Sequence, residues 1–153
     1  MFFPTLGWRC LPVLLLLSCQ AFAQSSTIGY VKTVGGDASL VLGSDTTAAV
    51  VGMPIQEGHI LKTGNAGGLG VVLKDNTSLS LGSNSEMAVR DFLYLPGKDA
   101  LKLELGLVRG TLYYISGVIA KLRPDAVAIK TPTGMIGVRG TQFLVLVDPE
   151  DAK

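Results

Sequence analysis

The chain has few of the residues on which metal and catalytic sites depend. Its two cysteines, Cys10 and Cys19, both lie in the first 23 residues, and it has one histidine, His59, and one tryptophan, Trp8. One histidine without cysteine cannot form a zinc site. After residue 23 the sequence also has no thiol for a disulfide and no indole to stack on a sugar. We therefore expect no metal and no cofactor.

The chain also lacks an excess of charge of one sign. Charged residues make up 16 % of the 153 positions, with thirteen Lys and Arg against twelve Asp and Glu, or twelve against twelve without Arg9. A nucleic-acid platform needs a basic surface, so nucleic acid is not an expected partner. The apolar share of 48 % is too high for a disordered chain.

Glycine, by contrast, is abundant. Nineteen glycines, eighteen of them after residue 23, are about double the usual share of ~7 %. Few long stretches are free of glycine or proline, and both residues weaken helices. This composition excludes a helical bundle.

Residues 1–23 have the pattern of a secretory signal peptide. Arg9 is the only basic residue, an apolar core runs from Leu11 to Leu17, and Ala21-Phe22-Ala23 is a small-x-small cleavage site. The apolar run is far short of the ~20 residues needed to cross a bilayer. We expect cleavage after Ala23 and export of residues 24–153, as one domain, to the periplasm or the cell surface.

The same segment has a second interpretation. Leu16-Leu17-Ser18-Cys19 resembles a bacterial lipobox, in which the cysteine thiol is acylated and the cysteine becomes the new N-terminus. Acylation at Cys19 would anchor the domain to a membrane, and a membrane is an expected partner only in that case. The sequence leaves both interpretations open.

Alternation of apolar and polar residues with a period of two dominates the rest of the chain. Leucine occupies every second position from Leu101 to Leu107, and similar alternation occurs at residues 38–42 and 78–81. Continuous apolar runs at residues 69–73 and 143–147 are typical of strands buried on both faces. Turn signals separate the runs by about 8 to 15 residues. The sequence predicts an all-β single domain, either a short β-solenoid or a β-sandwich.

Pro96 and Gly97 mark one of these turns. Proline and glycine occupy the two central positions of a type II turn in Leu95-Pro96-Gly97-Lys98. This turn predicts a strand that ends near Leu95 and another that begins near Ala100.

Residues 83–95 are ambiguous. Ser83 and Glu86 have the spacing of a helix capping box, and residues 87–95 contain neither glycine nor proline. A short helix is one interpretation. The positions of Met87, Val89 and Phe92 favour the other, an edge strand with a kink.

The candidate catalytic residues of the sequence lack the other residues that a catalytic site needs. A Ser-His-Asp hydrolase would have to use His59, which lies between a turn and a strand and has no Gly-x-Ser-x-Gly motif beside it. Lys62-Thr63-Gly64 matches one part of a β-lactamase signature whose other parts are absent. The glycine-rich residues 64–70 open no helix, as a phosphate loop would. We expect a protein that is not an enzyme, and a hydrolase built on His59 is the least favoured hypothesis.

Residues 127–145 resemble a known family. A Thr-Pro turn, a short strand and the sequence Val-Arg-Gly-Thr-x-Phe are similar to the hallmark of the FecR domain family. The hallmark positions are Thr131, Pro132, Gly134, Val138, Arg139, Gly140, Thr141 and Phe143. Four upstream segments resemble further parts of the family pattern: residues 28–37, 52–64, 73–79 and 105–110. His59 stands where the family usually has aspartate.

The hallmark positions also have a structural interpretation. Pro132 ends a ladder, the glycines permit sharp corners, and the threonine hydroxyls can close hydrogen bonds at corners. Phe143 is expected to be a core anchor. Arg139 is expected to satisfy loop carbonyls or a carboxylate such as Asp75, in preference to binding a ligand.

The resemblance implies an extracytoplasmic domain of the kind found in iron-uptake signalling regulators. In those proteins a cytoplasmic anti-sigma segment and a membrane helix precede the domain. This sequence shows neither, and little chain follows the last motif, so direct control of a sigma factor is not expected.

The expected function is that of an exported, non-enzymatic protein-interaction or signalling module of the bacterial cell envelope. An envelope protein would be recruited at an exposed strand edge. The alternative is a self-associating structural scaffold of the envelope or cell surface, which the neutral net charge favours.

Overall fold

The computed structural model describes residues 26–140, 142–148 and 150. The strands among them are β1 (Thr27–Gly35), β2 (Ala38–Leu42), β3 (Asp45–Ala48), β4 (Pro54–Gln56), β5 (Ile60–Thr63), β6 (Gly68–Leu73), β7 (Ser78–Leu81), β8 (Glu86–Leu95), β9 (Ala100–Ile115), β10 (Val127–Thr131), β11 (Gly134–Gly137) and β12 (Gln142–Val147). The helical segments are α1 (Val118–Leu122) and the 3₁₀ turns η1 (Pro96–Lys98) and η2 (Pro124–Ala126). The predicted all-β class is confirmed.

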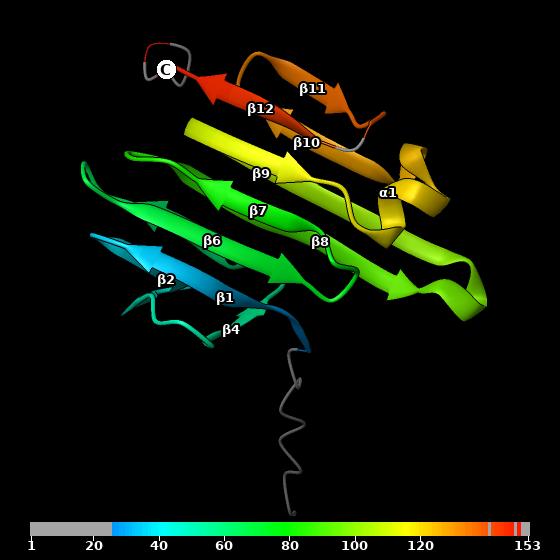
Figure 1. Ribbon diagram of the computed structural model, residues 1–153, viewed down its shortest axis with the longest axis horizontal. Coiled ribbons are helices and arrows are strands. Elements are labelled where there is room, and N and C mark those ends of the chain that lie inside the picture. Colours follow the sequence, from blue (N-terminus) through cyan, green and yellow to red (C-terminus); the bar gives the residue numbers. More distant parts are fainter. Residues whose placement is uncertain (1–25, 141, 149, 151–153) are drawn as a thin grey trace, which may run out of the picture.

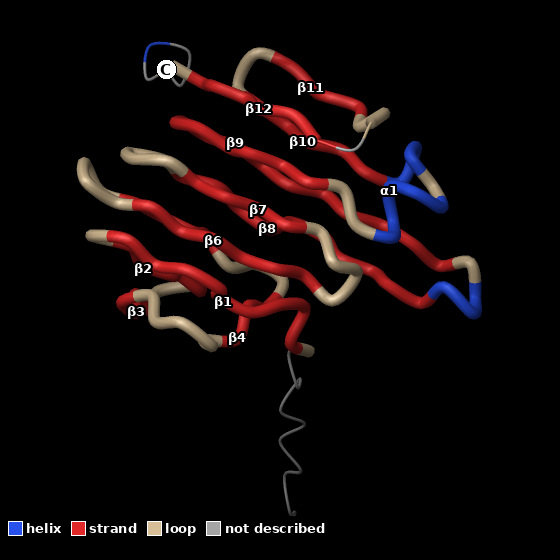
Figure 2. Tube along the Cα trace, in the orientation of Figure 1, coloured by secondary structure: helices blue, strands red, loops and turns tan. Residues whose placement is uncertain are grey.

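The twelve strands form one continuous sheet that curls over itself along β9 (Figure 1). The front half-sheet has the strand order β4-β1-β6-β7-β9-β12. The rear half-sheet has the order β3-β2-β5-β8-β9-β10-β11. The described pairs are antiparallel except β9 with β10. In Figure 2, β7 of the front half-sheet overlies β8 of the rear one.

β9 is 16 residues long and belongs to both half-sheets. Its first part pairs with β8 and β10, its last six residues pair with β12, and the last four of these also pair with β7. The two parts meet at Gly110, whose φ of 86° is a left-handed conformation that glycine adopts without steric cost. A Cβ at Gly110 would lie 2.5 Å from Ser85 Cα. Ser85 Oγ accepts from Thr111 N–H at 2.9 Å, so β8 is tied to the bend.

The core lies between the two half-sheets. Leucines at odd positions point inward in the first part of β9, whereas Leu112 and Tyr114 at even positions point inward after the bend. The largest fully buried side chains come from both half-sheets and from α1: Ile55, Leu61, Leu73, Leu79, Met87, Leu103, Leu105, Leu107, Leu112, Tyr114, Ile119 and Ile129. Each stabilises the fold by about 1.5–3 kcal/mol of transfer free energy.

Within residues 83–95 there is no helix: Ser83 and Asn84 form a turn, and Glu86–Leu95 form the kinked strand β8. β8 has register shifts between Glu86 and Met87 and between Val89 and Asp91. These shifts let Met87, Val89 and Phe92 all point into the core. The prediction that this strand lies at an edge holds only for its second part, because β8 pairs with β9 along its length but with β5 only at Glu86, Met87 and Ala88.

The strand at residues 143–147 is not buried on both faces, which corrects the sequence prediction. β12 pairs with β9 along one side only, and its side chains alternate between half-buried and exposed positions before Val147. Leu144 and Leu146 are 65 % and 66 % exposed. A continuous apolar run here belongs to an edge strand with one apolar face in solvent.

The turn between β8 and β9 is placed correctly, but its backbone differs from a type II turn. Residues 96–98 form the 3₁₀ turn η1, and the left-handed residue is Asp99, with φ of 51°, instead of Gly97. The one-turn helix α1 is a further element that the alternation pattern did not predict.

The bend in β9 leads to a stability prediction. Gly110→Ala places a Cβ against backbone and at positive φ, so we expect the free energy of unfolding to fall by at least about 2 kcal/mol. Gly97→Ala is the matched control, because nothing lies within 4 Å of a Cβ there. Urea denaturation measures both. Equal stability of the two variants would contradict the role given to Gly110.

Candidate functional site

The first hallmark residues form the β10–β11 hairpin. Thr131 ends β10, Pro132 and Thr133 make the turn, and Gly134 begins β11. Thr131 Oγ1 donates to Gly134 O at 3.0 Å and lies 3.4 Å from Thr133 Oγ1. The hydroxyls therefore close the turn, and Pro132 lies where no ladder bond is needed.

The residues after β11 connect this hairpin to β12. Val138 is buried, with 3 % of its surface exposed, and fixes the connection to the core. Gly140 O accepts from Ser116 Oγ at 2.5 Å, which ties the connection to the end of β9. Thr141 lies outside the described residues, as does Cys19.

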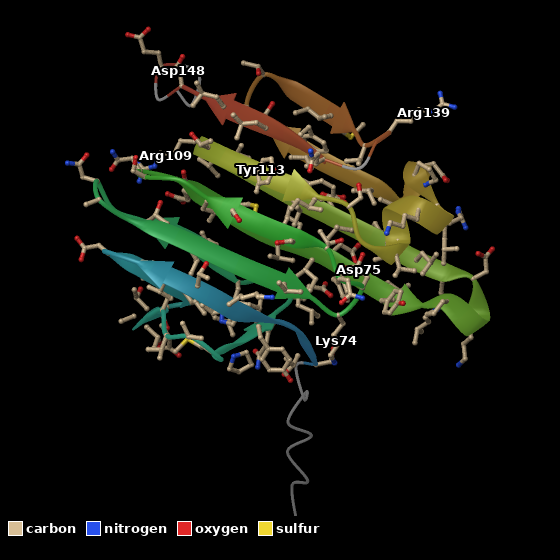
Figure 3. The ribbon with its side chains drawn as sticks, viewed as in Figure 1. Lys74, Asp75, Arg109, Tyr113, Arg139 and Asp148 are labelled. Carbon is tan, nitrogen blue, oxygen red and sulfur yellow. The ribbon has the colours of Figure 1, made fainter. Side chains whose placement is uncertain are left out.

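Arg139 is exposed and lies away from Asp75. Figure 3 shows its side chain pointing away from the body of the molecule. Among the described residues it makes no hydrogen bond and no ion pair, so neither the loop carbonyls nor the carboxylate expected for it is its partner there. It lines an open hollow of about 530 Å³ together with η2 and the β10–β11 hairpin. Asp125 in that hollow is paired with Arg123 at 3.2 Å, whose hydrogen bond lowers the pKa of Asp125.

Asp75 is instead the centre of a buried polar cluster, defined here as Asp75, Thr77, Gly117 and Ile119. Thr77 donates to Asp75 from its backbone N–H at 3.1 Å and from its hydroxyl at 2.7 Å. Ile119 N–H donates to Asp75 Oδ2 at 3.3 Å, and Gly117 N–H donates to Thr77 Oγ1 at 3.2 Å. The carboxylate therefore joins the β6–β7 turn to the start of α1.

The signal for this cluster was present in the sequence. An aspartate two residues before a threonine is the pattern of an Asx turn. Local spacing predicts the bonds from Thr77, but the bonds from Gly117 and Ile119, at the start of α1, come from residues forty or more positions away. Burial of Asp75, at 0 % exposure, could be found only from the fold.

Phe143 packs against the core from β12 without being fully buried. Its ring stacks on Tyr114, with ring centroids 4.8 Å apart and an interplanar angle of 20°. Burial raises the pKa of Tyr114. Phe143 thus attaches the inner face of β12 to the core.

The His59 side chain accepts a backbone hydrogen bond that closes a turn. Its Nδ1 accepts from Gln56 N–H at 2.8 Å across the turn before β5. Burial lowers the pKa of His59, so the neutral imidazole is favoured in the folded protein. Among the described residues, no serine hydroxyl or carboxylate is hydrogen-bonded to it.

The described part of the chain has neither a metal-binding cluster nor a membrane-spanning helix. No group of three His, Cys, Asp or Glu side chains lies close enough there to hold a metal ion. No helix there is long and apolar enough to span a membrane.

Comparison with protein families adds to the hallmark geometry. The model of the FecR protein family matches residues 59–153, from the turn before β5 to the end of the chain. The chain belongs to the FecR family. Comparisons with curated proteins and with solved structures found no match.

The match assigns the hallmark, the Asp75 cluster and β12 to the FecR domain. Strands β1 to β4 precede the matched residues, so the likeness of residues 28–37 and 52–58 to the family pattern is not part of the match. These strands nevertheless continue both half-sheets, through β1 with β6 and β2 with β5. FecR is a regulatory and signalling family.

The Asp75 cluster carries a stability prediction. Asp75→Ala leaves three buried donors unpaired, and we expect a loss of about 3–5 kcal/mol in the free energy of unfolding. Asp75→Asn keeps an acceptor and should lose less. Asp91→Ala, which removes only an ion pair with Lys102 at the surface, should cost less than about 1 kcal/mol. Urea denaturation of the three variants measures these losses. Equal losses of unfolding free energy in all three would contradict the assignment of Asp75 to a buried hydrogen-bond network.

His59 carries a pH prediction. Because folding lowers its pKa below the usual ~6.5, the unfolded chain binds more protons below that pH. The stability from neutral His59 is therefore complete above pH ~6.5 and declines as the pH falls below it. We expect His59→Asn to lose less stability than the wild type between pH 7.5 and 5.5, by urea midpoint. An identical loss in both proteins would contradict this role.

Proposed function

We propose that this FecR domain is an exported, non-enzymatic protein-interaction or signalling module of the cell envelope, and that β12 is its interaction edge. The observation that carries the proposal is that, among the described strands, β12 pairs with β9 alone and has a free outer edge. A strand paired on one side presents unpaired N–H and C=O groups to a partner strand. Strand addition at such an edge binds proteins through main-chain hydrogen bonds and needs no deep pocket.

The β12 edge has none of the devices that usually block strand pairing. Natural edges are protected by prolines, charges, bulges or short length. β12 contains six residues without proline or charge, and its ladder with β9 has no register shift.

The outer surface at this edge is uncharged, and large apolar or aromatic side chains lie there beside the polar Gln142. We define the β12 patch as Tyr113, Ile115, Leu144 and Leu146, which lie on neighbouring strands β9 and β12. Their exposed fractions are 37 %, 38 %, 65 % and 66 %. An exposed apolar patch of this kind marks an interaction site more often than an isolated leucine does.

The rear half-sheet offers a contrast. Its outer face has a series of ion pairs, in which Glu86 lies 3.6 Å from Lys62 and 3.5 Å from Arg109. Lys130 lies 2.7 Å from Glu104, and its hydrogen bond lowers the pKa of that carboxyl. Charges paired along a face are typical of a solvated surface, so we assign binding to the other half-sheet.

Export and localisation in this proposal rest on the sequence of residues 1–23, which lie outside the described residues. The family supports an envelope role. The alternative function is a self-associating scaffold, and the same free edge is the observation that favours it.

Site-specific cross-linking in living cells tests the proposal. A photoreactive residue at Leu144 should form adducts with an envelope protein or with a second copy. The matched control is Leu93 on β8, which is 41 % exposed but lies on the charged rear half-sheet. Adducts from Leu144 and not from Leu93 support the proposal. Absence of adducts at Leu144, or equal adducts at both positions, would overturn it.

A further inference from the structure

We propose that a second copy of this chain covers the β12 edge, by antiparallel pairing of the two β12 strands about a two-fold axis at Val145. The inference rests on the assignment of β12 as the interaction edge. It goes further because it names the occupant and the register. The two front half-sheets would become one continuous sheet across the axis.

Comparison of the four strands that end the two half-sheets identifies β12 as the edge suited to pairing with itself. The part of β8 beyond Val89 is also unpaired on the β5 side, but it carries the charges of Arg90 and Asp91. β3 begins with Asp45, and its four residues are all exposed. β4 has only three residues and begins with Pro54, which has no N–H. β11 begins and ends with glycine. β12 alone among these four has six residues with no proline, glycine or charge.

The exposed fractions indicate that a neighbouring strand fits beside β12. Tyr113 and Ile115 lie on β9, which has a strand on each side, and they are 37 % and 38 % exposed. Leu144 and Leu146 point to the same face of β12 and are 65 % and 66 % exposed. Leu144 and Leu146 are thus more exposed than Tyr113 and Ile115, which have a strand on each side. A further strand beside β12 would cover this additional exposed surface of the two leucines.

Pairing about Val145 makes the edge complementary to itself. In an antiparallel pair centred there, Leu144 of one copy lies opposite Leu146 of the other, on the same face of the sheet. Each contact occurs twice, as a two-fold interface requires. The apolar side chains that lack a neighbour within one copy thus gain one from the second copy.

The charges near the edge are compatible with this register. Asp148 follows β12 directly and lies near the end of that strand in Figure 3. In the proposed pair, Asp148 lies opposite Gln142 of the second copy, so the two Asp148 carboxylates are at opposite ends of the interface. Among the described residues from Gln142 to Asp148, no like charges meet across the axis.

The area available predicts a weak, reversible dimer. Six main-chain residues and the sides of their side chains bury on the order of 600–800 Å² in total, against ~1,200–2,000 Å² for stable specific interfaces. We therefore expect a dissociation constant between about 10 and 500 μM.

Sedimentation equilibrium of the exported protein, from micromolar to millimolar concentration, is the first test. The wild type should shift from monomer to dimer over this range. Leu146→Lys places a charge against the apolar side chain of the second copy and should weaken the dimer at least tenfold. Leu122→Lys on α1 is the matched control, since Leu122 is 57 % exposed and belongs neither to β12 nor to the β12 patch, and it should dimerise as the wild type does. A monomer throughout, or a dimer unaffected by Leu146→Lys, would overturn the inference.

Charge variants at Gln142 test the register. Gln142→Lys would lie opposite Asp148 of the second copy and attract it, whereas Gln142→Glu would repel it. At low salt we expect the lysine variant to dimerise about tenfold more tightly than the glutamate variant, with the difference reduced at high salt. Equal affinities would contradict pairing centred at Val145.

The outcomes separate this inference from the proposed function. If the protein stays monomeric while Leu144 is cross-linked in cells to a different protein, the second copy is excluded and β12 remains the interaction edge. If Leu144 forms no cross-link in cells and the purified protein is monomeric, both proposals fail.

Discussion

The shared strand β9 is the constraint on which the rest of the structure depends. Side chains of a strand alternate between two faces, so a slip of one residue would turn every inward side chain outward. Between Leu107 and Leu112 the inward positions change from odd to even, and the left-handed Gly110 makes that change possible. Ser85 holds the neighbouring strand at the same point. One corner therefore keeps both half-sheets facing a common core.

The position of the candidate site follows from this arrangement. β12 pairs with the last six residues of β9, and Phe143 stacks on Tyr114 of that segment. Asp75 fixes α1 directly after β9. The described hallmark residues therefore build the β10–β11 hairpin, its connection to β12 and the inner face of β12, and Val138 and Arg139 also line the open hollow beside η2. In the proposed function, the surface offered to a partner is the outer edge of β12 with the four side chains of the β12 patch.

Much of the strand content could be predicted from the sequence, because alternation reports which face of a strand is buried. The alternating leucines of β9 and the kink of β8 at Met87, Val89 and Phe92 are examples. Alternation does not report which strands are neighbours, so residues 143–147 were expected in the interior and the pairing of the first part of β8 with β5 was not foreseen. The burial of Asp75 and the exposure of Arg139 were also beyond local patterns, since both depend on contacts distant in the chain. The family hallmark correctly located the informative segment, while the edge itself became visible only in the sheet order.

Amide hydrogen exchange of β12 in dilute purified protein tests the central claim most directly. The account predicts that amides of β12 pointing away from β9 exchange rapidly at low micromolar concentration, because no strand covers them, and become protected as the concentration rises. The amides of β7, which is paired on both sides, should be protected at every concentration. Slow exchange along both sides of β12 in dilute solution would show that its edge is already covered within one chain, and would contradict its assignment as the interaction edge.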